Sequence, residues 1–244
     1  VYVSFRAHRS IPGIGGAFTN KAIAGGGALI DWGVHYLDIV MYCTGDPKAT
    51  SVSAKAYSKL GVDMPNYVYE GMWAEDTKDL NGTYDVDDFV TGFVRTSGPT
   101  ITFNGAWAQN IGVGEMYIDF MGDKAGVRLQ YGSNFTVYTD QLEEYTPTVE
   151  FRNHFQNEID AFVRCIQTGE KLPSHIDTVA ITAKITAMAI KPAMISVERS
   201  SIIRSKMSSG MTRGAMYSSP VSKSPNSLAS HCFVFSGSLE CTTV

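Results

Sequence analysis

Residues 25–38 read Gly25-Gly26-Gly27-Ala28-Leu29-Ile30-Asp31-Trp32-Gly33-Val34-His35-Tyr36-Leu37-Asp38. Apolar residues in and just after this stretch recur at helical spacing in two stripes. These are Leu29, Trp32, Tyr36 and Val40, and Ile30, Val34, Leu37 and Met41. A helix from Gly25 through Tyr42 is therefore expected to be buried on most sides. Gly45 is a suitable residue for its end.

Two ionisable residues interrupt this apolar helix. Asp31 and His35 are four residues apart, so a helix places both on one face, about one turn from each other. A carboxylate beside an imidazole can hold the tautomer of a His that moves a proton to or from a hydroxyl. Most such pairs are only contacts on a helix surface. Buried ionisable groups are costly unless they are paired or used, however, so the pair is a candidate catalytic site.

The rest of the chain favours an α+β domain. A strand is expected over Val1–Arg9, followed by a loop rich in Gly and Pro. From residue 49 onward the pattern has period two with short turn signals, which favours a mostly antiparallel sheet. The expected strands are Ala49–Tyr57, Asp88–Arg95, Thr100–Ala108, Glu115–Gly122, Gly126–Tyr131 and Phe135–Thr139. Helical spacing then returns in two segments, one that ends at Gly169 and one that begins near Asp177.

The chain divides by composition near residue 191. Residues 1–191 are expected to form one folded domain. Residues 192–244 are rich in Ser and have little periodicity, which predicts a poorly ordered tail. The alternative for this tail is a short strand within Ser230–Gly237.

Composition excludes several classes of protein. Hydrophobic residues make up 44% of the chain and charged residues 18%, as in ordinary globular proteins. The net charge of −4 argues against a nucleic-acid partner, and no apolar run is long enough to predict a membrane-spanning helix. The cysteines have neither Cys-x-x-Cys spacing nor a nearby His pair, so we expect no metal site and reduced thiols in a cytoplasmic protein. They are Cys43, Cys165, Cys232 and Cys241.

The segment from Arg6 to Gly45 resembles the start of the C-terminal domain of the Gfo/Idh/MocA oxidoreductase family. The residues that match are Arg6, Arg9, Phe18, Gly25, Gly26, Gly27, Asp31, Gly33, His35 and Asp38. Three later segments are also similar: Gly122–Gly126, Phe155–Phe162 and Gly169–Pro173. The resemblance covers residues 1–190.

This resemblance implies an open-faced sheet packed with helices, as in the C-terminal domain of glyceraldehyde-3-phosphate dehydrogenase. It implies an enzyme in which a separate Rossmann domain binds NAD or NADP and a hydride leaves a sugar or cyclitol. His35 would be the acid/base, Asp31 would orient it or bind the sugar, and Gly26 and Gly27 would lie at the cofactor. Residues 1–191 would thus be the substrate-binding and oligomerisation domain. Its sheet face would join subunits of a homo-oligomer, either a dimer or a tetramer.

The cofactor half is expected to be missing from this chain. Residues 13–18, Gly-Ile-Gly-Gly-Ala-Phe, lack the third glycine of a dinucleotide fingerprint. Residues 170–173, Glu-Lys-Leu-Pro, only approximate the family's Glu-Lys-Pro motif. We therefore expect a fragment that is inactive alone, and an out-of-frame C-terminus is a further hypothesis.

Five more residues are candidates for substrate contacts, since sugars are held by polar groups and stacked on aromatic rings. They are Arg9, Asp38, Asn104, Trp107 and His154. The alternatives are a salt bridge for Arg9, a solvent contact or a salt bridge for Asp38, core or sheet-face packing for Trp107 and a position in the helix-cap region for His154. For the whole chain, the alternatives are a non-catalytic sheet domain for oligomerisation or ligand binding, and a hydrolase that uses NAD transiently.

Overall fold

A computed structural model describes residues 1–71, 78–149, 153–172 and 174–190. In these residues one sheet holds eight strands in the order β2-β3-β4-β1-β5-β6-β7-β8. The strands are β1 (Tyr2–Arg6), β2 (Ala49–Tyr57), β3 (Phe89–Thr96), β4 (Thr100–Ala106), β5 (Glu115–Met121), β6 (Ala125–Gln130), β7 (Phe135–Thr139) and β8 (Glu144–Tyr145). The predicted α+β class with an open sheet is therefore confirmed.

The first strand of the chain lies in the middle of the sheet. β1 runs parallel to β4 on one side and antiparallel to β5 on the other. The other neighbouring strands pair antiparallel, as predicted. Because β1 and β4 run in the same direction, the residues that follow Arg6 and those that follow Ala106 emerge side by side at one end of the sheet.

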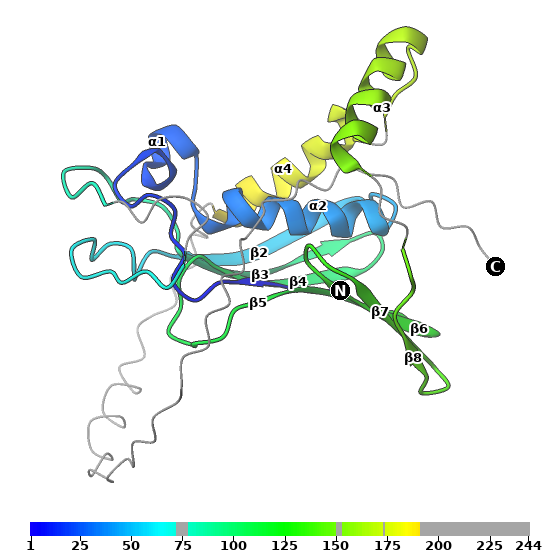
Figure 1. The fold of residues 1–244 in the computed structure, drawn as a ribbon, viewed down its shortest axis with the longest axis horizontal. Helices are drawn as coiled ribbons and strands as arrows, with labels where there is room; N and C mark the ends of the chain where they lie inside the picture. The colour runs from blue at the N-terminus through cyan, green and yellow to red at the C-terminus, as the bar shows by residue number, and fades with distance from the viewer. Residues whose placement is uncertain (72–77, 150–152, 173, 191–244) are drawn as a thin grey trace.

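Helices cover one face of this sheet (Figure 1). They are α1 (Lys21–Ala24), α2 (Val34–Cys43), α3 (His154–Thr168) and α4 (Ile176–Ile190), with a 3-10 turn η1 (Ala17–Thr19) and a π-helical turn η2 (Leu29–Gly33). Figure 1 shows α2 and α4 lying across the sheet, α1 beyond one end and α3 beyond the other. The opposite face bears no helix in the described residues.

The main core lies between the sheet and the α2–α4 layer. The strands contribute the buried residues Val3, Phe5, Val90, Val94, Ile101, Phe103 and Ile118. The helices contribute Leu29, Tyr36, Leu37, Val40, Met41, Ile185 and Ala189. A second cluster, which we call the loop core, consists of Ile11, Ile14, Ala28, Tyr67, Val86, Trp107 and Ala108. The predicted burial of the long helix is confirmed on its sheet-facing side, while Ile30 and Val34 are half-buried.

The helix predicted from Gly25 to Tyr42 does not begin at its glycines. The short helix α1 precedes them and ends at Gly25, whose φ of 82° is a left-handed cap. The helix resumes with the π turn η2 and continues as α2 to Cys43. Four residues are too few to show helical periodicity, so the sequence pattern did not reveal α1.

The two closing helices lie where the sequence predicts them. α3 ends at Gly169, which is left-handed with a φ of 71°. Its apolar stripe is exposed within the described part of the chain: Phe155, Ile159, Phe162, Val163 and Ile166. On α4, Ile185 is buried and Met188 is exposed. The predicted tail 192–244, with its alternative strand and Cys232 and Cys241, lies outside the described residues.

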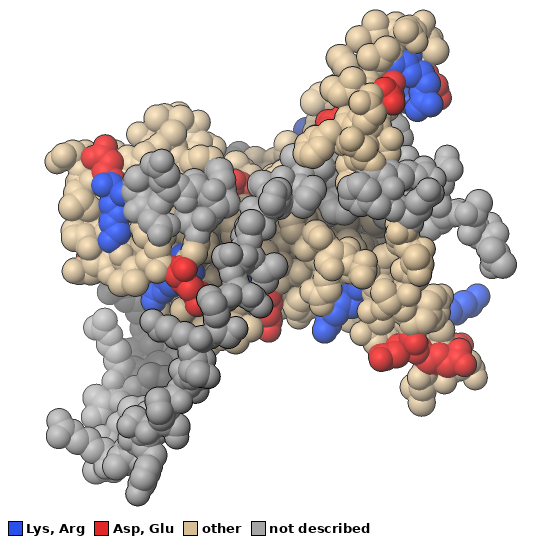
Figure 2. Space-filling model, viewed as in Figure 1, with Lys and Arg blue, Asp and Glu red and all other residues tan. Residues whose placement is uncertain are grey.

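The surface shown in Figure 2 is mostly uncharged. Its charged side chains occur in a few small groups, and several of these contain both acidic and basic residues. Among the helices that the structure describes, none combines the length and apolar character needed to cross a bilayer.

Candidate functional site

Asp31 lies on a widened helical turn that leads into α2. In this turn the backbone N–H of Val34 donates to the carbonyl of Leu29, five residues earlier, which is the π-helical pattern. The backbone N–H of Asp31 donates to the carbonyl of Gly27 at 3.0 Å. π turns are rare and are frequent at functional sites. The interval from Asp31 to His35 therefore spans the junction of η2 and α2 rather than one regular α-helical turn.

An indole holds the Asp31 carboxylate. Trp107 Nε1 donates to Asp31 Oδ2 at 2.9 Å. Trp107 follows β4 directly, and its side chain is fully buried. Its backbone N–H donates to the carbonyl of Asp88 at 2.9 Å, and its carbonyl accepts from Ser10 at 2.8 Å. The buried ring leaves no face on which a sugar stacks, which favours the core-packing alternative for Trp107.

The surroundings of Asp31 act on its ionisation in both directions. Burial raises the pKa of Asp31 above its ordinary value. The Trp107 hydrogen bond opposes this rise of the pKa, and the charge of His35 opposes it to a smaller extent. The structure thus brings Asp31 close enough to His35 for an electrostatic interaction, and both side chains are half-buried.

A second carboxylate, Asp87, holds the start of this helix. Asp87 Oδ1 accepts from the Gly27 N–H at 2.8 Å, and Oδ2 accepts from Leu29 at 3.2 Å. Its backbone carbonyl also accepts from Ala28 at 3.0 Å. Burial raises the pKa of Asp87, and the hydrogen bonds from Gly27 and Leu29 oppose that rise. Sequence reasoning missed Asp87, although acidic residues directly before a strand were a visible signal.

The next residue, Asp88, organises the segment after β2. Asp88 Oδ2 accepts from the backbone N–H groups of Lys59, Leu60 and Gly61 at 2.8, 2.6 and 2.9 Å. The Asp88 backbone carbonyl also accepts from Trp107, so Asp88 connects the residues that follow β2 to the residue that holds Asp31.

The glycines before η2 are packed against the protein itself. A side chain at Gly27 would overlap the backbone carbonyl of Asp87, and one at Gly26 would lie 2.7 Å from Ile30 Cγ1. Close approach to another segment of backbone therefore explains glycine at position 27. The assignment of Gly26 and Gly27 to a cofactor stays a prediction.

Arg9 lies at the same end of the sheet as Trp107. It pairs with Ala108 in an isolated bridge, and its guanidinium donates to Asn110 Oδ1. The guanidinium also lies 5.8 Å from the centre of the Tyr67 ring. The structure thus gives Arg9 contacts with the β4 exit and the loop core, and its role in substrate binding stays a prediction.

Three other predicted residues lie apart from Asp31. Asp38 Oδ1 accepts from Thr182 Oγ1 at 3.1 Å, which joins α2 to α4. Asn104 donates to Tyr2 Oη at 3.1 Å and alternates with the inward-facing Phe103, so it lies on the open face of the sheet. His154 is the first residue of α3, at the far end of the sheet from α1 (Figure 1). Their substrate contacts stay predictions.

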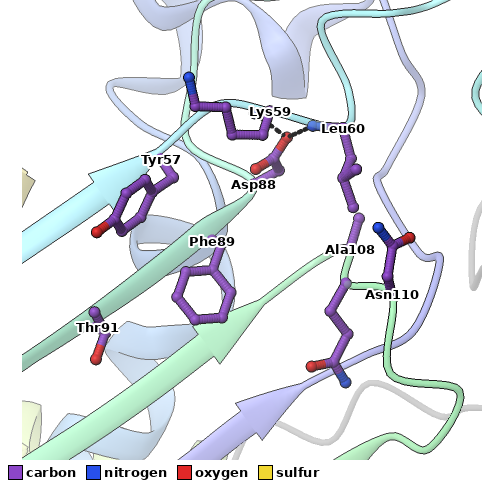
Figure 3. A pocket seen from close by; sticks show the side chains of 9 residues that line it. Tyr57, Lys59, Leu60, Asp88, Phe89, Thr91, Ala108 and Asn110 are labelled. Carbon is purple, nitrogen blue, oxygen red and sulfur yellow. Dashed lines mark hydrogen bonds between the residues drawn. The ribbon is translucent and has the colours of Figure 1, made fainter. Parts of the chain in front are cut away.

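A shallow pocket of about 390 Å³ lies at the edge of the open face (Figure 3). Tyr57, Phe89 and Thr91 line it from β2 and β3, and Asn110 lines it from the β4 exit. The Asp88 carboxylate at its rim turns toward the backbone of Lys59 and Leu60. This pocket is therefore separate from the Asp31 site, which lies on the helical face.

Three comparisons place the chain among known proteins. A family model described as the GFO/IDH/MocA C-terminal domain matches residues 1–128. The D-glucoside 3-dehydrogenase of Escherichia coli (strain K12) is 32% identical over 163 residues, which cover 64% of this chain and 43% of that protein. A putative UDP-kanosamine synthase oxidoreductase subunit of Amycolatopsis mediterranei (strain S699) is 33% identical over 130 residues, which cover 51% of this chain and 34% of that protein. The chain thus spans less than half the length of these relatives.

A solved structure supports the same fold. Levoglucosan dehydrogenase in complex with NADH and levoglucosan has a TM-score of 0.54 at 18% identity, over 77% of this chain and 55% of that one. At this identity the likeness shows a shared fold.

Proposed function

Because the chain belongs to the GFO/IDH/MocA family, we propose that it is the substrate-binding and subunit-contact half of an NAD(P)-dependent oxidoreductase that acts on a sugar or cyclitol hydroxyl. The observation that supports this most is the half-buried Asp31 carboxylate on a π turn, within the electrostatic reach of His35. Buried ionisable groups in such a setting are favoured at functional sites.

In the proposed reaction, His35 accepts the proton of the substrate hydroxyl as the carbon is oxidised, and it returns the proton in the reverse direction. Asp31 orients His35 or accepts a hydrogen bond from the sugar. The half-burial of both residues supports this assignment, because a proton acceptor must be accessible on one side and held on the other. Bound NAD(P) would supply the hydride acceptor.

The described residues are better suited to bind the substrate than to bind the phosphates of NAD(P). Asp31 and His35 suit a hydroxyl group. By contrast, Ile30 and the Asp87 backbone already occupy the space beside Gly26 and Gly27. This supports a cofactor bound mainly by another domain, and it supports our expectation that this chain alone is inactive.

We also propose that the open face of the sheet joins subunits into a homodimer or homotetramer. This face carries polar side chains already fixed to one another: Arg128 donates twice to Asp119 at 2.7 Å and lies 4.3 Å from the centre of the Tyr117 ring. Thr102 lies exposed on β4, near the middle of the sheet. Thr102→Lys should therefore lower the mass measured by light scattering to that of the monomer while the chain stays folded, and an unchanged mass would contradict this interface.

Activity of the complete protein tests the proposed reaction. The chain joined to its dinucleotide-binding half should reduce NAD or NADP with D-glucosides or cyclitols, measured by absorbance of the reduced nicotinamide. The chain alone should show no turnover. A complete protein that forms oligomers and yet reduces neither cofactor with any member of the panel would instead support the non-catalytic sheet domain.

A further inference from the structure

Trp107 contacts the candidate site from the core, through a hydrogen bond to Asp31. Its side chain is fully buried, and its indole N–H points at Asp31 Oδ2 at 2.9 Å. We propose that Trp107 is a positioning residue, which fixes the orientation of the Asp31 carboxylate and favours its ionised form. This inference rests on the proposed role of Asp31 in the reaction.

The indole is a rigid donor. The backbone of Trp107 is hydrogen-bonded on both sides, to Asp88 and to Ser10. Its ring lies in the loop core with Ile11 and Ala28, and Ala28 directly precedes the π turn that bears Asp31. The donor therefore stays in place when the charge of Asp31 changes.

In this pair the indole is always the hydrogen-bond donor and the ionised carboxylate is always the acceptor. An indole has one N–H group and no acceptor atom. It engages Oδ2, so the rotation of the Asp31 carboxylate is fixed. In the part of the chain that the structure describes, no side chain donates to Oδ1 of Asp31, which leaves that oxygen for His35 or a substrate hydroxyl. The charge of His35, on α2, also lowers the pKa of Asp31.

The same contact opposes the cost of burial. A hydrogen bond to the charged form of a carboxyl lowers its pKa, while desolvation raises it. Trp107 is thus the neighbour that most strongly keeps a half-buried Asp31 ionised. Loss of the N–H should therefore leave a carboxyl that is both more mobile and more readily protonated.

The indole signals test this directly. The chain has three tryptophans, Trp32, Trp73 and Trp107, so a spectrum of ¹⁵N-tryptophan protein contains three indole resonances. Trp32→Phe and Trp73→Phe assign two of them, and the third belongs to Trp107. The Trp107 indole signal should shift with pH as Asp31 ionises, and Asp31→Asn should abolish that shift. A Trp107 signal that is independent of both pH and Asp31→Asn would overturn the proposal, even if Trp107→Phe fails to fold.

Kinetics of the complete protein supply the second readout. Trp107→Phe should lower kcat about 10- to 100-fold, as expected when a catalytic group is misplaced. It should also move the acidic limb of the pH–rate profile upward. Trp32→Phe is the control, because it removes a half-buried indole on the same turn without touching Asp31 Oδ2. An unchanged profile in a folded Trp107→Phe protein would overturn the positioning role.

The two arms separate this inference from the function on which it rests. An active enzyme whose Trp107 signal does not follow Asp31 contradicts the positioning role alone. A Trp107 signal that follows Asp31 in a complete protein without turnover contradicts the proposed function, and with it any catalytic meaning of the contact.

Discussion

Asp87 Oδ1 accepts a 2.8 Å hydrogen bond from the backbone N–H of Gly27, sixty residues earlier in the chain. Together with the bond from Leu29, this contact satisfies backbone donors at the start of the helix that bears Asp31. The position of the candidate site thus depends on a carboxylate that takes no part in the proposed chemistry.

Asp87→Asn should destabilise the fold. The amide can accept from only one of the two backbone donors, and its N–H₂ group faces the other. We expect a loss of about 1–3 kcal/mol in the free energy of unfolding, measured with urea. Asp123→Asn, at an exposed turn, should change it by less than about 0.5 kcal/mol. Equal effects of the two substitutions would show that the Asp87 contact is not stabilising.

Gly27→Ala should also destabilise the chain, because the added methyl group would overlap the Asp87 carbonyl. Overpacking of this kind costs about 1–3 kcal/mol. Gly112→Ala is the matched control, since nothing lies within 4 Å of the added carbon there. The comparison requires only thermal unfolding curves. If Gly27→Ala is as stable as Gly112→Ala, the close approach of the two backbones is wrong.

The stability of the chain should depend on pH through Asp31. Burial raises its folded-state pKa above the ordinary value of 3.8. A carboxyl with a raised folded-state pKa contributes stability fully below its unfolded-state pKa, and this contribution is lost as the pH rises through the folded-state value. Asp31→Asn removes this dependence. The variant should therefore gain stability relative to the wild type as the pH rises from about 4 toward neutrality.

Urea titrations of both proteins across this range measure the difference, because all other titrating groups are common to them. A difference that stays constant or shrinks as the pH rises would contradict a raised pKa for Asp31.

Two isoleucines should differ sharply in their contribution to stability. Ile185 on α4 is 1% exposed and lies in the main core, whereas Ile159 on α3 is 57% exposed. Ile185→Ala should cost about 2–4 kcal/mol of unfolding free energy, and Ile159→Ala less than about 0.5 kcal/mol. A large cost at Ile159 would mean that the α3 stripe packs against the chain.

Much of this fold follows from periodicity, because burial on one side imposes it. The spacing of Leu29, Tyr36 and Val40 predicts a helix whose sheet-facing side is buried, and the alternation in β2 to β7 predicts the antiparallel sheet. The parallel β1–β4 pair could not be predicted in this way. Its partners lie about one hundred residues apart, and alternation does not specify which strands are neighbours.

The residues of the candidate site could be proposed from the sequence, but the contacts between them could not. Asp31, His35 and Trp107 each stand out in the sequence, yet no local pattern joins Asp31 to an indole 76 residues away. The π turn was missed as well. The residues at its start, Gly27 and Leu29, bind the distant Asp87, and helical spacing does not reveal such a contact.

We propose that His35 transfers a proton in the oxidation of a sugar or cyclitol hydroxyl. In the complete protein, kcat for NAD(P) reduction should fall at least about 100-fold in His35→Ala, as expected when a general base is removed. His175→Ala, on the α3–α4 connection, should retain the wild-type rate. Wild-type turnover by a folded His35→Ala protein would contradict the claim.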